Sequence, residues 1–149
     1  MREGWISDNL SNCIKLKSGI GLTAKNMIPG DFPVFGGNGI AGYHNEFNLT
    51  GEHLIIGRVG ALCGNARYVN DKIWLTDNAF RISEFKYDFD LEFLNYLLNH
   101  INLRTYARQA AQPVISNSSL KNVNLSFPKS LPEQKQIVAI LDQTFEAID

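Results

Sequence analysis

The last third of the chain constrains the fold most, because a change of hydrophobic periodicity there marks a strand that runs into a helix. In residues 122–127, Val123, Leu125 and Phe127 alternate with polar residues, which is typical of a half-buried strand. From Pro132 onward, apolar residues recur every three or four positions, which predicts an amphipathic helix. Pro132 suits the first turn of that helix, where its missing N–H is not needed.

The apolar stripe of this helix is a candidate interface, and its members are Ile137, Ile140, Leu141, Phe145 and Ile148. From Pro132 to the last residue, a continuous helix would extend about 27 Å at ~1.5 Å per residue. The stripe runs on to the end of the sequence without a capping glycine or asparagine, which favours docking on another element. Periodicity alone leaves open whether the helix folds back onto its own domain or pairs with a partner.

Composition indicates one globular domain without a membrane span. A chain of 149 residues can bury a core, and its 44% hydrophobic and 19% charged residues are ordinary values. No apolar run approaches the ~18 residues of a membrane-spanning helix, and the N-terminus lacks the apolar centre of a signal peptide. Cys13 and Cys63 have no metal-binding spacing, which favours the reducing cytoplasm.

The middle of the chain predicts short strands joined by glycine-rich turns. Residues 33–35 form a short strand before the glycine-rich block Gly36–Gly39, and residues 53–69 form a hairpin that turns at Gly60–Gly64. Residues 73–83 give two short strands separated near Asp77-Asn78. With the C-terminal helix, these elements define an α+β fold of short twisted strands followed by a long helix.

Two further helical segments are expected before the final strand. Asp90 is placed to cap a helix with the stripe Leu91, Leu94, Leu98 and Ile101. A second stretch, residues 103–110, would place Arg104 and Arg108 four positions apart on one face.

The glycine-rich block and the residues around it supply the candidate binding groups. Its glycines allow close approach to a partner, although the phosphate-loop pattern GxxxxGK[ST] is absent, and a tight hairpin turn is an equally good reading. Asn38 could read a base edge. Arg58 lies between two glycines, where it could contact phosphate or guanine or form an ion pair across its hairpin. Asn78 is either a turn former or a recognition side chain, and the turn is favoured.

Catalytic chemistry has no support in the sequence. His44, His53 and His100 lack metal-ligand spacing, and no nucleophile motif is present. No catalytic residue, metal ligand or cofactor is therefore expected. A net charge of −1 requires any nucleic-acid binder of this composition to segregate its charges. The composition and motifs predict a recognition module rather than an enzyme.

These motifs, in their order and spacing, resemble the target recognition domain of the DNA-specificity subunit of type I restriction-modification enzymes. The resemblance covers essentially the whole chain. It rests on Trp5 and Leu10, on the blocks FGGNGIAGY (35–43), LIIGRVGALCG (54–64) and WLTDNAF (74–80), on Gln112-Pro113 and Ile115-Ser116, and on Leu120, Phe127-Pro128, Leu131, Glu133-Gln134, Ile137-Val138 and Leu141.

The resemblance implies a recognition domain over residues 1–130 and the start of a conserved coiled-coil spacer helix over residues 131–149. It implies binding of double-stranded DNA, with methyltransferase and restriction subunits as partners and chemistry confined to them. The helix would pair with that of a second recognition domain, or of a second copy of this chain. We expect DNA contacts from Lys25, Asn38, Arg58, Arg67, Asn78, Arg108, Gln112, Ser116 and Asn117.

Two alternatives remain open from the sequence. The chain could be a protein-interaction module that acts through its C-terminal helix and has no affinity for DNA. A small hydrolase using His44 or His53 near the glycine-rich block is a weaker hypothesis. Salt-dependent binding to duplex DNA would distinguish the first reading from the DNA-binding one, because phosphate contacts weaken as salt is added.

Overall fold

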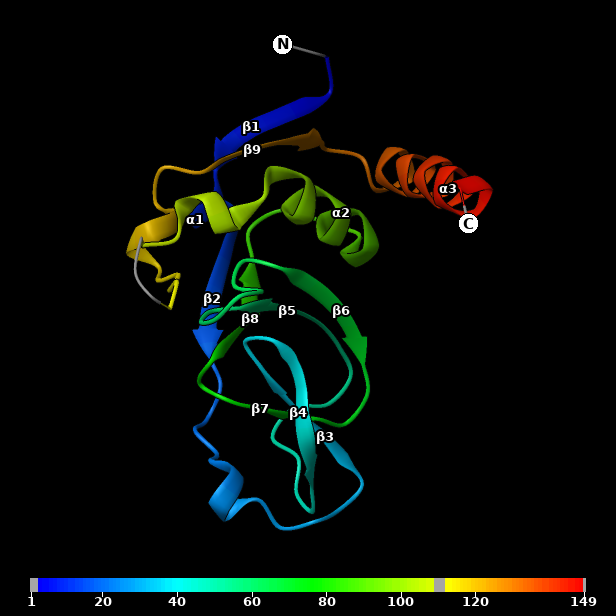
Figure 1. Cartoon of the computed structure of the whole chain (residues 1–149). Coiled ribbons are helices and arrows are strands. Elements are labelled where there is room, and N and C mark those ends of the chain that lie inside the picture. The colour runs from blue at the N-terminus through cyan, green and yellow to red at the C-terminus, as the bar shows by residue number, and fades with distance from the viewer. Residues whose placement is uncertain (1–2, 109–111, 149) are drawn as a thin grey trace.

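A computed structural model describes residues 3–108 and 112–148, with side chains described up to Phe145. Figure 1 shows the elements in chain order. They are β1 (Trp5–Asn9), α1 (Leu10–Cys13), β2 (Ile14–Ser18), the 3-10 turn η1 (Ala24–Asn26), β3 (Phe32–Gly36), β4 (Gly39–His44), β5 (Glu52–Gly57), β6 (Ala66–Asn70), β7 (Trp74–Leu75), β8 (Ala79–Phe85), α2 (Leu91–Ile101), the 3-10 turns η2 (Leu103–Tyr106) and η3 (Ser118–Leu120), β9 (Asn124–Pro128) and α3 (Leu131–Ile148).

The strands of the described residues form three sheets. The central sheet has the order β2-β8-β5-β6, and all of its pairs are antiparallel. A smaller sheet has the order β4-β3-β7, in which β3 pairs in parallel with β7. The third is a ribbon of β1 and β9, which lie side by side at the top of Figure 1. The α+β class expected from the sequence is confirmed.

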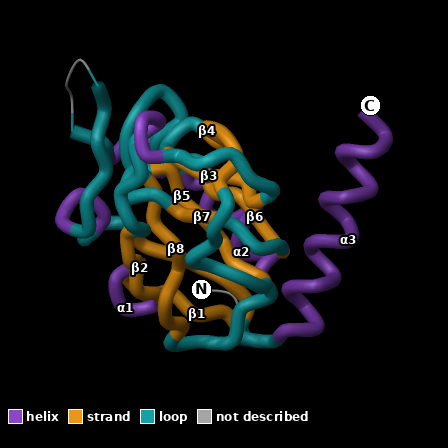
Figure 2. The backbone as a smooth tube through the Cα atoms, turned by 90° about the horizontal axis from the view of Figure 1, so that it is seen from below, coloured by secondary structure: helices purple, strands orange, loops and turns teal. Residues whose placement is uncertain are grey.

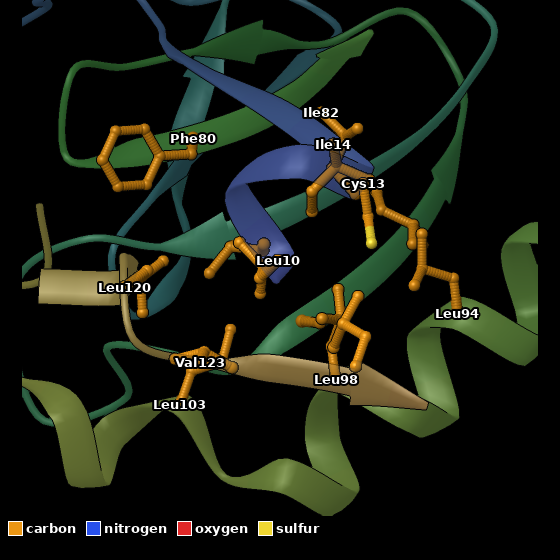
Figure 3. Close-up of a cluster of buried hydrophobic side chains, with 14 of the residues drawn as sticks. Leu10, Cys13, Ile14, Phe80, Ile82, Leu94, Leu98, Leu103, Leu120 and Val123 are labelled. Atoms are coloured by element: carbon orange, nitrogen blue, oxygen red, sulfur yellow. The ribbon is translucent and has the colours of Figure 1, made fainter. Parts of the chain in front are cut away.

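The main core lies on one face of the central sheet, between that sheet, α2 and the ribbon. Leu94 and Leu98 of α2 are fully buried there, as are Leu125 and Phe127 of β9. Figure 3 shows side chains from α1, α2, β8 and the chain before β9 meeting in this cluster. The expected alternation of β9 is confirmed, because Val123, Leu125 and Phe127 are buried while the residues between them are exposed.

A second, smaller core packs the β4-β3-β7 sheet against the other face of the central sheet. Its buried members are Phe35, Ile55, Val69, Ile73, Leu75 and Ala79. The central sheet is thus covered on both faces, and strand ends and turns are left to carry exposed polar groups.

The predicted hairpins and the capped helix are confirmed. β5 and β6 form the expected hairpin, and β7 and β8 are separated by the turn at Asp77-Asn78. Asp90 caps α2, because its carboxylate accepts a hydrogen bond from the Phe93 amide at 3.0 Å. The block Gly36–Gly39 closes the β3–β4 hairpin rather than cradling a phosphate.

The second helix expected at residues 103–110 is wrong. Asn102 adopts a left-handed conformation at φ 60°, which ends α2, and only the short turn η2 follows. The Arg108 amide donates to the Val114 carbonyl at 3.0 Å instead of continuing a helix. Arg104 and Arg108 therefore do not share a helical face, and residues 109–111 lie outside the described part of the chain.

Helix α3 is fixed to the domain at its first turns by one buried amide. The Ser130 hydroxyl accepts from the Glu133 amide at 3.4 Å, so the helix begins one residue before Pro132. The fully buried Gln134 side chain accepts from the Asp90 amide at 2.8 Å and donates to the carbonyls of Asp88 and Pro128 at 3.0 and 2.9 Å. Figure 2 shows α3 along one side of the domain.

Candidate nucleic-acid interface

Loops that are far apart in the sequence meet at one end of the central sheet, and we call this region the loop junction. It comprises the β3–β4 turn (36–39), the β5–β6 loop (58–65), the β7–β8 turn (76–78) and the segment 113–116. The tip of the β3–β4 hairpin lies near the β5–β6 loop in Figure 1. The Gly60 amide donates to the Pro113 carbonyl at 3.1 Å, which joins the second loop to the fourth.

Arg58 lies at the centre of the loop junction. Its amide donates to the Asn78 carbonyl at 2.9 Å, and its carbonyl accepts from the Ile115 amide at 2.8 Å. Its Nη1 donates to the Asp77 carbonyl at 3.1 Å, and the guanidinium lies 5.6 Å from the centre of the Phe80 ring. Arg58 is therefore held between the loops. Its guanidinium hydrogen-bonds to the Asp77 backbone carbonyl and not to a carboxylate, as the ion pair considered from the sequence would require.

Asn38 also connects two loops. Its Oδ1 accepts a hydrogen bond from the Leu62 amide at 3.0 Å, so one end of this side chain is used within the protein. The β5–β6 loop receives a further hydrogen bond from Nη1 of Arg104 to the Ala61 carbonyl. Two predicted candidates for base contacts, Asn38 and Arg58, thus take part in holding the loops together.

Gly37 permits the closest approach in the loop junction. A Cβ atom at this position would lie 1.8 Å from the Val59 carbonyl oxygen and 3.2 Å from that of Asn78. Any side chain would therefore force the hairpin turn away from its neighbours. At the adjacent Gly36, the nearest atom to a Cβ would be Oγ1 of Thr76 at 3.7 Å, which is an ordinary contact.

A row of cations crosses the central sheet next to the loop junction. The strand register places Lys17 beside Arg81, Arg81 beside Ile55, and Ile55 beside Arg67, so these side chains share one face of the sheet. Lys17 is exposed, and Arg81 and Arg67 are half-buried. The Arg67 guanidinium lies 5.7 Å from the centre of the Phe35 ring. Lys17 and Arg81 were not predicted, because only the strand pairing brings them into line with Arg67.

The segment that begins at residue 112 borders the loop junction. Gln112 and Asn117 are exposed, and Ser116 is half-buried with its hydroxyl 2.9 Å from that of Ser118. The Arg108 side chain is exposed beside Val114, whose carbonyl accepts from the Arg108 amide. Gln112, Ser116 and Arg108 therefore lie next to the loops that contain Arg58 and Gly60. Asn117 instead lines a hollow together with residues of α1 and β2, among them Ser11 and Leu16.

Lys25 and Asn78 differ from the other predicted DNA contacts in their position or in their hydrogen bonds. Lys25 lies in η1 at the bottom of Figure 1, away from the β3–β4 turn. Its neighbours pack on the other end of that hairpin, since the Ile28 amide donates to Nδ1 of His44 at 3.0 Å. Asn78 lies in the turn that the sequence favoured, but the Thr76 hydroxyl closes it by accepting from the Asn78 amide at 3.2 Å, and the Asn78 side chain is exposed.

Positive charge near the loop junction is not neutralised by ion pairs among the described residues. The recorded pairs, Lys15–Glu84 at 3.5 Å and Lys86–Asp8 at 3.9 Å, do not include Arg58, Arg67, Arg104 or Arg108. Within residues 3–108 and 112–148, no group of three or more His, Cys, Asp or Glu is placed to hold a metal ion. The same part of the chain has no helix that is long and apolar enough to cross a membrane.

The predicted helix interface is only partly covered. Ile137, Leu141 and Phe145 line an apolar groove between α3 and α2, with a volume of about 800 Å³. Tyr96 crosses this groove, because its hydroxyl donates to the Asp142 carboxylate and its ring stacks on Phe145 at 5.7 Å. The carboxylate at this hydrogen bond raises the pKa of Tyr96 to about 12.

Two members of the apolar stripe face solvent. Ile140 is 59% exposed and Phe145 is 50% exposed. The side chain of Ile148 lies outside the described residues. One side of α3 therefore packs on its own domain and another side faces solvent. Pairing of this helix with a partner stays a prediction.

The fold and the loop junction define a mixed α+β domain whose loops meet at one end of the central sheet, with a terminal helix beside it. A family model described as the type I restriction modification DNA specificity domain matches residues 12–149. The chain therefore belongs to the family of type I restriction-modification DNA specificity domains.

Relatives of known sequence or structure agree with this assignment. The chain is 36% identical over 139 residues to the type I restriction enzyme EcoprrI specificity subunit of Escherichia coli, covering 90% of this chain and 34% of that protein. The type I restriction-modification S subunit from M. genitalium has the same fold, with a TM-score of 0.80, 22% identity, and coverage of 95% of this chain and 39% of that one. The HsdS subunit from Thermoanaerobacter tengcongensis also has this fold, with a TM-score of 0.68 and 18% identity. The match covers 99% of this chain and 39% of that one. The chain thus spans about a third to two fifths of the length of these relatives.

Proposed function

We propose that this chain is a reader of double-stranded DNA sequence, acting in the cytoplasm as one target recognition domain of a type I restriction-modification enzyme. The observation that carries the proposal is the convergence of loops with arginines that lack ion pairs at one end of the central sheet. Such a surface suits phosphate contacts that set register and polar side chains that read base edges. Methylation and cleavage would belong to partner methyltransferase and restriction subunits.

Arg108 and Lys25 make a matched pair for testing this function. Both are exposed cations, but Arg108 borders the loop junction and Lys25 lies away from it. The experiment measures binding of the purified chain to duplex DNA across a salt series, beginning at low salt. We expect Arg108→Gln to weaken binding to all sequences and to reduce the salt slope by about one unit.

Lys25→Gln is the control and should leave both affinity and slope unchanged. Wild-type binding that does not depend on salt would contradict the proposal, as would equal effects of the two substitutions. In either case the loop junction would not be the surface that contacts phosphates.

The groove beside α3 supports a second component of this function. We propose that the face containing Ile140 and Phe145 pairs with the corresponding helix of a second recognition domain, in another copy of this chain or in a longer specificity subunit. Burial of these exposed apolar side chains would stabilise the pair, and tethering two readers would raise their joint affinity. The residues expected to take part are Ile137, Ile140, Leu141, Phe145 and Ile148.

Pairing can be tested with two charge substitutions on the same helix. Leu141 lines the groove, whereas Ala139 is exposed and does not. Light scattering over a range of concentrations should show a dimer that Leu141→Asp removes and Ala139→Asp retains, with circular dichroism verifying that both variants are folded. A monomer at all concentrations would exclude self-pairing and leave a second domain in a longer subunit as the partner.

A further inference from the structure

One apolar side chain of the loop junction is exposed although the backbone that carries it is fixed. Leu62 is 46% exposed. Its amide donates to Oδ1 of Asn38 at 3.0 Å, and its carbonyl accepts from the Asn65 amide at 3.1 Å. The preceding carbonyl, of Ala61, accepts from the Arg104 guanidinium. Hydrogen bonds on both sides therefore hold Leu62 in one position at the surface.

The Leu62 side chain forms part of the wall of a small recess. The recess has a volume of about 20 Å³, and Phe35, Ile55, Gly39 and Arg67 also line it. A space of this size holds roughly one water molecule or one methyl group. Phe35, Ile55 and Leu62 give the recess apolar walls that a methyl group can contact, and Asn65 and Arg67 are also part of its lining.

We propose that Leu62, which lines this recess, contacts the C5-methyl group of a thymine and thereby contributes to sequence specificity. The thymine methyl group is the apolar feature of the base pairs in the major groove, and it is read by apolar side chains. Arg67 and Arg104 flank the recess and the loop, and they supply the positive charge that an approaching phosphate backbone requires. The inference rests on the proposed DNA-binding function and names one of its specificity contacts.

The test removes the methyl group from the DNA and the leucine from the protein. Selection from randomised duplexes with the full chain first gives the preferred sequence, and each thymine in it is then replaced in turn by deoxyuridine. We expect one replacement to weaken wild-type binding about fourfold, the value of one buried methyl group. Leu62→Ala should bind the thymine and deoxyuridine duplexes equally at that position.

Ile28→Ala is the matched control, because Ile28 is 57% exposed and lies in the segment that packs on the far end of the β3–β4 hairpin. It should keep the wild-type loss at the same thymine. Thermal unfolding of both variants verifies that neither substitution acts through stability.

The outcomes separate this inference from the proposed function. Selection of a preferred sequence that lacks thymine, or deoxyuridine effects that persist in Leu62→Ala, would overturn the role of Leu62 and leave DNA recognition intact. If no duplex sequence is enriched by the wild-type chain, both the proposed function and this inference are overturned.

Discussion

The Ile115 amide donates a hydrogen bond to the Arg58 carbonyl at 2.8 Å, and this contact joins the segment before η3 to the loop after β5. Similar backbone contacts join Gly60 to Pro113 and Arg58 to Asn78. Because such bonds use groups that nearly every residue carries, they fix the loops without specifying the exposed side chains. The arrangement can therefore persist while the exposed side chains of the loops differ.

The close approach at Gly37 gives a prediction with a control at the next residue. Gly37→Ala would place a methyl group 1.8 Å from the Val59 carbonyl oxygen, and we expect it to lower the free energy of unfolding by about 1–3 kcal/mol. Gly36→Ala meets only an ordinary contact at 3.7 Å and should have little effect. Urea denaturation measures both, and equal stability of the two variants would show that the turn can move freely.

Arg58 should be required for the structure of the loops more than for contact with one phosphate. Arg58→Met removes the hydrogen bond to the Asp77 carbonyl and the stacking on Phe80. We expect a loss of about 1–3 kcal/mol in the free energy of unfolding, with weaker DNA binding to all sequences. Unchanged stability together with a salt slope smaller by about one unit would instead assign Arg58 to the phosphate backbone.

Gln134 is predicted to fix the start of α3. Gln134→Met keeps an unbranched side chain but leaves the Asp90 amide and the carbonyls of Asp88 and Pro128 without their partner. Buried groups left unpaired cost about 1–3 kcal/mol each, so chemical denaturation should show a loss above about 2 kcal/mol. Gln136→Met, on the exposed side of the same helix, should be neutral. If Gln134→Met leaves the free energy of unfolding unchanged, water molecules must take over the hydrogen bonds of the Gln134 side-chain amide.

The contact between Tyr96 and Asp142 should make the attachment of α3 sensitive to alkaline pH. Hydrogen bonding to the carboxylate raises the pKa of Tyr96 from 10.0 to about 12. A pKa raised by folding stabilises the protein below the ordinary value and loses this effect as pH rises through the folded value. The difference in melting temperature between wild type and Tyr96→Phe should therefore be constant below pH 10.0 and shrink towards about 12. A difference that does not change with pH would contradict this role.

The elements of the fold could be predicted from sequence where periodicity and capping act over a few residues. The alternation of Val123, Leu125 and Phe127 and the cap at Asp90 are local signals of this kind. The helix expected after Leu103 failed because one left-handed residue, Asn102, ended the preceding helix. The spacing of apolar residues does not reveal that Asn102 takes this backbone conformation.

The candidate site was less accessible to sequence reasoning, because strand pairing and loop contacts create it. Nothing in the local sequence aligns Lys17 and Arg81 with Arg67, since this requires the register of four strands. Gln134 follows Glu133 in the first turn of the helix, and the hydrophobic pattern there does not show that its side chain is fully buried. Asn38 stays a predicted base contact, and its local sequence does not show that its Oδ1 accepts from the Leu62 amide.

The ribbon of β1 and β9 pairs Trp5 with Pro128 and Asn9 with Asn124, so the polypeptide enters and leaves the domain side by side. A unit with neighbouring entry and exit points can be exchanged between polypeptides as a cassette, since both junctions lie in one place. The terminal helix begins at Leu131, shortly after the β1–β9 ribbon ends at Pro128. Exchange of the residues between the two junctions would leave the start of this helix in place.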